Sequence, residues 1–182
     1  RDYDKKIRPL HIQAEEARVR EFTVLSAFKG WTQEGLGELS EVTRDKRFSI
    51  GETVCKEGDD TFMGHFMMMI RKGTVEKWKK MPGGGEILLG LLEPGDTIDL
   101  RHVVKGEPIA YTGLCSSIVD VMFTSSHEIL PPKDSQKKPV IDRATLDALL
   151  DREKVVPEGK ELVDFARNQE RWKQYREQYM SS

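Results

Sequence analysis

The chain has 182 residues, with 29 basic and 31 acidic side chains and a formal net charge of −2. This length suffices for one domain with a buried core, and the charge balance gives no electrostatic reason to expect a nucleic-acid partner. Because the sequence has no apolar run of about 18 residues and no secretory signal, we expect a cytoplasmic protein without a membrane span.

The N-terminal segment, residues 1–47, is predicted to be helical. From Leu10 to Leu25 apolar residues recur at steps typical of an amphipathic helix. Gly30 follows and ends this helix, and Thr32 is placed to cap a second one. Both helices are expected to pack against the part of the chain that follows. The alternative is that the charged first helix, Lys5 to Glu21, docks on a protein partner.

Residues 48–112 alternate between glycine-containing turns and short strand-like runs. The turns are Ile50–Glu52, Lys56–Asp60, Arg71–Gly73 and Glu93–Asp96. The runs between them are Thr53–Cys55, Phe66–Ile70, Thr74–Trp78 and Glu86–Leu92. Short runs at this spacing predict a compact antiparallel sandwich or barrel. Because alternate side chains of a strand face opposite sides, we expect the run Met67–Met69 to lie in the core.

Cysteine and histidine spacing predicts neither a metal site nor a catalytic centre. Cys55 and Cys115 fall in strand-like runs, so we expect buried, reduced thiols, with a disulfide between them as the alternative. The histidines have no cysteine or carboxylate partners at ligand spacing. They are His11, His65, His102 and His127.

The order of these turns and runs resembles the β-roll of the cyclic nucleotide-binding domain family. The matching positions are Phe48, Gly51, Glu52, Val54, Glu57 to Asp59, Phe66 to Ile70, Gly73, Leu92 and Pro94 to Asp96. The resemblance extends over Phe22 to Tyr179 and implies a mainly β fold with flanking helices (α+β), an antiparallel, jelly-roll-like β-roll. It divides the chain into N-terminal helices at 1–47, the roll at 48–142 and C-terminal lid helices at 143–182.

The family's phosphate-binding cassette follows the glycine turn at Gly95, and its defining residues are replaced here. The family has a glycine–glutamate pair at the start of a short helix, then an arginine followed by alanine and threonine or serine. This chain carries Asp99 for the glycine, Leu100 for the glutamate and Ile109 for the arginine, before Ala110 and Thr112. A lost charge-assisted hydrogen bond costs about 1.5–3 kcal/mol, so we expect ordinary cyclic AMP and cyclic GMP binding to be lost.

Two interpretations of this cassette remain open. In a shifted register Arg101 would meet a phosphate and Glu107 a sugar. In the other, which we favour, polar residues form a solvated turn around a short amphipathic helix whose apolar face fills the former pocket. The polar set is Asp99, Arg101, His102, Lys105 and Glu107, and the apolar set is Leu100, Val103 and Val104.

Beyond the cassette, the sequence predicts further strands, a loop and a helix. One strand spans Leu114–Thr124, and a polar, proline-rich loop at 125–138 is longer than the tight turn that the family has there. Val140–Arg143 is expected to be the last strand of the roll. Asp142 is placed to cap a helix at Arg143–Glu153. The buried stripe of that helix is Leu146, Leu149 and Leu150.

A final helix is predicted from Glu158 to Met180, with an aromatic stripe of Trp172, Tyr175 and Tyr179. In the family this helix is a lid that folds over the pocket and often lays an aromatic ring on the nucleotide base, a role that Trp172 would suit. The alternative is a helix that is docked permanently or that binds a partner.

These features favour a non-enzymatic regulatory or scaffold module that needs no cofactor. We expect it to act through protein–protein contacts of its terminal helices and the 125–138 loop in a larger intracellular assembly, such as a cilium or flagellum. The alternative is a ligand-responsive regulatory domain that binds a cyclic nucleotide or a nucleoside through an altered pocket. An enzyme of the related cupin barrels would need a histidine and carboxylate metal set that this sequence lacks.

Overall fold

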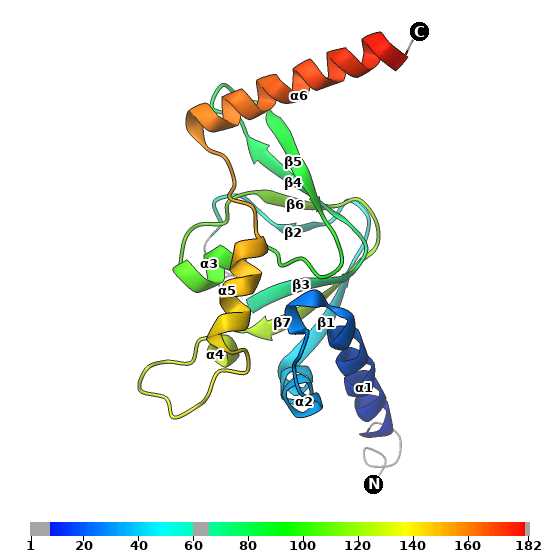
Figure 1. The fold of residues 1–182 in the computed structure, drawn as a ribbon, viewed down its shortest axis with the longest axis vertical. Helices are drawn as coiled ribbons and strands as arrows, with labels where there is room; N and C mark the ends of the chain where they lie inside the picture. Colours follow the sequence, from blue (N-terminus) through cyan, green and yellow to red (C-terminus); the bar gives the residue numbers. More distant parts are fainter. Residues whose placement is uncertain (1–7, 60–65, 181–182) are drawn as a thin grey trace.

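The computed structural model of the chain describes residues 8–59 and 66–180 and contains two antiparallel sheets (Figure 1). The first sheet has the order β1-β7-β3, with β1 at Thr43–Phe48, β7 at Val119–Ser125 and β3 at Phe66–Lys72. The second has the order β2-β6-β4-β5, with β2 at Thr53–Cys55, β6 at Thr112–Cys115, β4 at Val75–Lys80 and β5 at Glu86–Leu92. The predicted mainly β fold is confirmed, and the described strands form an open roll rather than a closed barrel.

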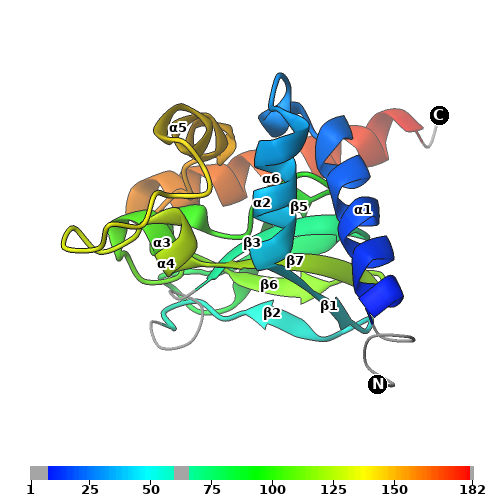
Figure 2. The ribbon, with the colours of Figure 1, turned by 90° about the horizontal axis from the view of Figure 1, so that it is seen from below.

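Helices surround the sheets. The N-terminal ones are α1 (Arg8–Val24), a short 3-10 helix (Ser26–Phe28) and α2 (Gln33–Val42). The later ones are α3 (Leu100–Lys105), α4 (Ser126–Ile129), α5 (Arg143–Arg152) and α6 (Gly159–Met180). Figure 2 shows α1, α2 and α5 on one side of the first sheet, whereas α6 lies beside the β4–β5 hairpin at the other end of the molecule (Figure 1). Among the described helices, none is long and apolar enough to cross a membrane.

Two apolar clusters form the core. The inter-sheet cluster consists of Phe48, Val54, Cys55, Met68, Ile70, Val75, Leu92, Ile98, Ile109, Tyr111, Cys115, Val119 and Val121. The helix-side cluster consists of Phe22, Phe28, Leu36, Leu39, Met67, Met69, Leu100, Met122, Ile129, Ile141, Leu146, Leu149 and Leu150. Strand β3 contributes alternate residues to the two clusters, as the geometry of a strand requires. The expectation that the methionine run lies in the core is therefore confirmed.

Local signals predicted the helix boundaries well. Gly30 has a φ of +88°, in the left-handed region, where glycine carries no steric cost. The hydroxyl of Thr32 accepts a hydrogen bond from the Gly35 amide at 3.1 Å and caps α2. The carboxylate of Asp142 accepts one from the Thr145 amide at 2.8 Å and caps α5. The predicted leucine stripe of α5 is buried.

Three predicted segments are wrong. Residues 43–47 were assigned to the helical segment but belong to β1, which pairs with β7. The four inner residues of β1 are exposed, so the sequence shows no alternation of apolar residues that would predict a strand. The predicted strand Leu114–Thr124 is interrupted at 116–118, between β6 and β7. This interruption packs closely against the turn between β3 and β4: a Cβ on Gly73 would lie 2.2 Å from the Ile118 carbonyl oxygen, so only glycine fits there. Residues 140–142 lie outside any strand, and Ile141 instead joins the helix-side cluster.

The 125–138 segment is only partly the predicted polar loop. It begins with the short helix α4, in which Ile129 is buried in the helix-side cluster. The amide of Val140 donates a hydrogen bond to the carbonyl of Glu128 at 2.8 Å and closes the loop at its base. Residues 132–139 are exposed, so this part of the loop is free to vary without affecting the core.

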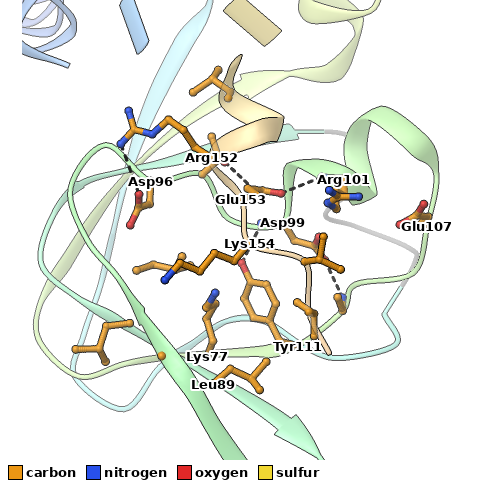
Figure 3. A pocket seen from close by; sticks show the side chains of 18 of the residues that line it. Lys77, Leu89, Asp96, Asp99, Arg101, Glu107, Tyr111, Arg152, Glu153 and Lys154 are labelled. Atoms are coloured by element: carbon orange, nitrogen blue, oxygen red, sulfur yellow. Dashed lines mark hydrogen bonds and ion pairs between the residues drawn. The ribbon is translucent and has the colours of Figure 1, made fainter. Parts of the chain in front are cut away.

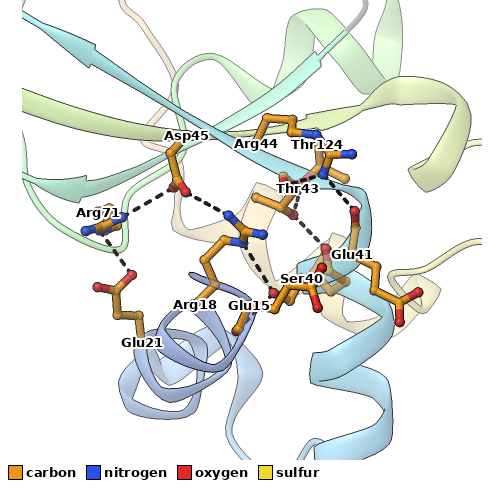
Figure 4. Close-up of polar contacts among 11 residues, drawn as sticks. Glu15, Arg18, Glu21, Ser40, Glu41, Thr43, Arg44, Asp45, Arg71 and Thr124 are labelled. Atoms are coloured by element: carbon orange, nitrogen blue, oxygen red, sulfur yellow. Dashed lines mark hydrogen bonds and ion pairs between the residues drawn. The ribbon is translucent and has the colours of Figure 1, made fainter. Parts of the chain in front are cut away.

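A polar network attaches α1 to the first sheet (Figure 4). The guanidinium of Arg18, only 7 % exposed, donates to the Asp45 carboxylate at 2.9 Å and to the Ser40 hydroxyl at 3.2 Å. Arg71 on β3 lies 3.1 Å from the Glu21 carboxylate and 3.4 Å from that of Asp45. The described part of the first helix therefore packs on the roll, while its predicted beginning at Lys5 lies outside the described residues.

We predict that Arg18→Ala lowers the free energy of unfolding by about 2 kcal/mol, because the buried Ser40 hydroxyl loses its donor and the partly buried Asp45 carboxylate keeps only its longer contact with Arg71. Urea unfolding measures the change. Arg20→Ala, an exposed position on the same helix, is the control and should change stability by less than about 0.5 kcal/mol. Equal effects of the two substitutions would contradict the structural role assigned to Arg18.

Both thiols are free and buried, so the predicted disulfide alternative is not formed. Burial raises the pKa of the Cys55 thiol to about 12, and its Sγ donates to the Tyr111 carbonyl at 3.7 Å. Burial also raises the pKa of Cys115.

We predict that neither thiol reacts with an aromatic disulfide reagent in the folded protein near neutral pH, because the reactive thiolate is absent. Both should react once the chain is unfolded in denaturant. Since both pKa values are raised above the unfolded value of about 8.5, their contribution to stability is present below that pH and falls as the pH rises above it. Rapid labelling of the folded protein would refute this prediction.

Candidate ligand pocket

A cavity of about 590 Å³ opens beside the cassette (Figure 3). Strands β4 and β5, the turn after β5, the start of α3 and the connection between α5 and α6 form its walls. Its lining residues include Lys77, Leu89, Asp96, Thr97, Asp99, Arg101, Glu107, Pro108, Ala110, Tyr111, Leu149, Arg152, Glu153, Lys154, Val156, Glu158 and Glu161. Strand and turn residues thus supply one wall, and a segment far along the sequence supplies the other.

Asp99 occupies an unusual backbone position at the start of α3. Its φ of 45° is the only positive value among the described non-glycine residues. The left-handed region costs most L-residues about 1–2 kcal/mol, and aspartate is one of the few that adopt it routinely. Such a backbone position suits a glycine, which is the residue that we expect the family to have there, and the assignment of Asp99 to that position stays a prediction.

The side chain and amide of Asp99 join the two ends of the cassette. Its Oδ2 accepts a hydrogen bond from the Ala110 amide at 2.7 Å, and its amide donates to the Tyr111 hydroxyl at 3.0 Å. Burial raises the pKa of Asp99 despite the bond from Ala110. Burial also raises the pKa of Tyr111 well above its usual value, so Tyr111 stays a neutral phenol.

A second carboxylate, from Glu153, lies at the first amides of α3. Its Oε1 accepts hydrogen bonds from the Thr97 hydroxyl and the Leu100 amide, both at 2.7 Å, and its Oε2 accepts one from the Arg101 amide at 3.4 Å. Burial raises the pKa of Glu153, and the three hydrogen bonds oppose that shift. These amides are the ones that we expected to face a cyclic phosphate, so a side chain of the protein itself occupies them.

The predicted cassette residues separate into three groups. Asp99, Arg101 and Ala110 line the cavity. Leu100 packs in the helix-side cluster and Ile109 in the inter-sheet cluster, so both lie in the core. The remaining two lie elsewhere: the Nδ1 of His102 contacts the Glu107 carbonyl, and the Thr112 hydroxyl accepts a hydrogen bond from the Glu57 amide at 3.2 Å.

The favoured interpretation of the cassette is wrong in two respects. Asp99 and His102 are each 6 % exposed, so these two residues are buried rather than solvated, whereas Lys105 and Glu107 are exposed. A short helix does form, but its apolar residues Leu100, Val103 and Val104 pack toward the helix-side cluster and leave the pocket open. The alternative role for Arg101 is not tested. Its side chain lines the cavity, and its buried Nε has no hydrogen-bond partner among the described residues.

The aromatic stripe of α6 lies away from this cavity. Trp172, Tyr175 and Tyr179 are exposed by 66 %, 52 % and 63 %. Trp172 lines a different hollow together with Ile87 and Leu88 of β5, where the Gln169 side chain donates to the Leu88 carbonyl at 2.9 Å. The cavity is covered instead by the α5–α6 connection and the first turn of α6, through Glu158 and Glu161.

The sequence did not reveal several residues that define the pocket. The ammonium of Lys77 lies 5.6 Å from the centre of the Tyr111 ring, and burial lowers the pKa of Lys77. Tyr111 lies in the sequence between Ala110 and Thr112, which were predicted to be pocket residues. This position could have been used to predict that Tyr111 lines the pocket. Glu153 is the last residue of a predicted helix and carries no sequence signal of a contact 53 positions away.

Comparisons with known proteins agree with this geometry. Residues 45–130 match the family model described as the cyclic nucleotide-binding domain. Comparison with curated protein sequences gives no match. Among solved structures, the regulatory domain of Toxoplasma gondii PKA with cAMP superposes with a TM-score of 0.64 at 15% identity, covering 78% of this chain and 50% of that one.

Two trypanosomal structures are also similar. The regulatory subunit of a cAMP-independent protein kinase A from Trypanosoma cruzi, bound to guanosine, has a TM-score of 0.58 at 17% identity, covering 68% of this chain and 43% of that one. A triple mutant of the Trypanosoma brucei subunit, bound to cAMP in the A site, has a TM-score of 0.64 at 14% identity, covering 85% and 52%. This chain therefore spans about half the length of these kinase regulatory proteins.

The open β-roll with a cavity beside a short helix is the fold that these solved structures share. The match over residues 45–130 and this shared fold support the cyclic nucleotide-binding domain family.

We predict a distinct order of stability at position 99. Asp99→Ala loses the bond to the Ala110 amide and puts alanine, which tolerates the left-handed region less well than aspartate, at this position, so it should lower the free energy of unfolding by about 2–3 kcal/mol. Asp99→Gly loses only the bond and should be more stable than the alanine variant by about 1 kcal/mol. Asp99→Asn keeps an acceptor oxygen and is the control. Chemical denaturation measures all three, and an alanine variant as stable as the glycine variant would refute the assignment.

Proposed function

We propose that the chain is a non-enzymatic regulatory or scaffold module in which ordinary cyclic AMP and cyclic GMP binding is lost. The observation that supports this most strongly is electrostatic: the carboxylates of Asp99 and Glu153 flank the start of α3, where a nucleotide phosphate would need a cation. A phosphate is bound best by arginine in a bidentate pair. Ile109, at the arginine position, is instead buried in the inter-sheet cluster.

The energetic consequence of this arrangement is large. A cyclic nucleotide would have to displace the Glu153 carboxylate from the Leu100 amide and would find the buried Ile109, not an arginine, at the family's arginine position. It would also lose the ribose contact that a glutamate makes, because Leu100 packs away from the cavity. Each missing charge-assisted hydrogen bond costs about 1.5–3 kcal/mol, and two of them reduce affinity by a factor of several hundred or more.

The proposed module acts through protein–protein contacts. Exposed aromatic residues on α6 support this: the ring centroids of Trp172 and Tyr175 lie 5.9 Å apart, and those of Tyr175 and Tyr179 lie 4.4 Å apart. Such a row on a helix suits a protein partner. The exposed 132–139 part of the loop offers a second contact surface. The proposed setting, a larger intracellular assembly such as a cilium or flagellum, rests on the family resemblance alone.

A second candidate function is binding of an uncharged nucleoside. The cavity of about 590 Å³ remains open, with Leu89, Tyr111 and Val156 as apolar walls and Lys77 as a polar group. A nucleoside has no phosphate to compete with Glu153. The guanosine in the Trypanosoma cruzi regulatory subunit lends support to this candidate.

Thermal unfolding with millimolar cyclic AMP, cyclic GMP, adenosine or guanosine tests both candidates. A ligand at about 100 times its dissociation constant stabilises the folded state by about 2.7 kcal/mol, which is readily measured. We predict no shift with either cyclic nucleotide. A shift with a nucleoside alone would favour the second candidate, and a shift with a cyclic nucleotide would refute the proposed loss of binding.

A further inference from the structure

We propose that Glu153 acts as an internal latch that holds the α5–α6 connection and the first turns of α6 closed over the β-roll without any nucleotide. The proposal concerns the regulation of the same pocket and rests on the proposed function, in which no nucleotide occupies that position. It assigns to a side chain of the protein the position at the α3 amides that a ligand anion would otherwise take.

The acceptor and its donors are well matched. Oε1 of Glu153 accepts two short hydrogen bonds, from the Thr97 hydroxyl and the Leu100 amide, each at 2.7 Å. Glu153 forms no ion pair with any described residue, so these donors and the longer bond from the Arg101 amide at 3.4 Å stabilise its charge. Backbone amides at the start of a helix favour a carboxylate in this way.

The donors belong to a rigid part of the molecule. Thr97 is 4 % exposed and forms a β-bridge with Met69 of β3. The next amide, from Ile98, donates to the Met68 carbonyl at 2.9 Å. The latch therefore joins the end of α5 to backbone that is paired with β3, an edge strand of the first sheet.

The segment that Glu153 anchors has few other strong attachments. Glu153 follows the last residue of α5, and residues 154–158 lead from it across the cavity to α6. Beside the latch, Arg152 lies 3.9 Å from Asp96, and Lys79 lies 3.6 Å from Glu158, whose side chain is 77% exposed. Ion pairs with an exposed partner contribute little to stability. Within α6 only Leu162 is buried.

The position of the α5–α6 connection and of α6 thus depends mainly on the latch, whereas α5 is held in place by its buried leucines. If the latch opens, the connection and the first turns of α6 lose their main polar attachment, while the sheets keep both apolar clusters. The expected effect is local opening rather than global unfolding, since segments with few buried contacts open independently of the core.

Hydrogen–deuterium exchange on the full chain tests this proposal. Glu153→Gln keeps the size of the side chain and removes its charge. Thr97→Val keeps the shape of threonine and removes the hydroxyl donor. Asp151→Asn, at an exposed position of α5 two residues before Glu153, is the matched control. Thermal unfolding of the same samples measures global stability.

The expected result is faster exchange in residues 153–165 of Glu153→Gln, by about tenfold to a hundredfold, from the loss of a charge-assisted contact. Thr97→Val should accelerate the same peptides by a smaller factor. Exchange in β3 and β4 should not change, and Asp151→Asn should match the wild type. The local pattern separates a latch from a contact that only adds to global stability.

Three outcomes would overturn the proposal. They are unchanged exchange at 153–165 in Glu153→Gln, an equal acceleration in β3 and β4, and a Glu153→Gln variant that fails to fold while Thr97→Val leaves the segment unchanged. Adding cyclic AMP to the wild type tests the proposed function separately. If the nucleotide stabilises the fold while Glu153→Gln still loosens 153–165, the loss of binding is refuted and the latch is supported.

Discussion

Strand β3 is the element on which the rest of the structure depends, because both of its faces are buried and its edge holds the cassette in place. Met68 and Ile70 belong to the inter-sheet cluster, whereas Met67 and Met69 belong to the helix-side cluster. The backbone of residues 95–98 pairs with it: the Gly95 amide donates to the Ile70 carbonyl at 2.8 Å. The start of α3 is therefore fixed relative to both cores, and any group that binds there is bound by a rigid surface.

That rigid surface keeps the form of an anion-binding cassette but not its usual partners. The backbone still turns through a left-handed position at residue 99, and the first amides of α3 still point at a carboxylate. Two carboxylates, from Asp99 and Glu153, lie there, and in the proposed function they stand where a nucleotide phosphate would need a cation. A fold can keep its backbone while the chemistry of its site changes, so membership of the family does not by itself establish which ligand is bound.

The parts of the fold that were predictable are those with a local physical cause. Gly30, Thr32 and Asp142 each act on neighbouring backbone groups, so their helix boundaries followed from the residue types. Strand β1 was missed because its four inner side chains are exposed and charged or polar, and its strand conformation comes from pairing with β7. The short helix α4, at the start of the 125–138 segment, was missed because only one of its residues, Ile129, is buried. That residue packs in the helix-side cluster, which the local sequence does not reveal.

The sequence by itself indicated the family, the order of the turns, and the residues at positions 99, 100 and 109 from which we infer a replaced cassette. Each of these follows from residue identity at a position within a short local pattern. Only the tertiary structure decided that the pocket stays open, that Leu100 and Ile109 turn into the core, and that Glu153 reaches an amide 53 positions away. A hydrogen bond from a backbone amide to a distant carboxylate leaves no pattern in the amino-acid sequence. Whether it forms depends on how the fold brings the two segments together.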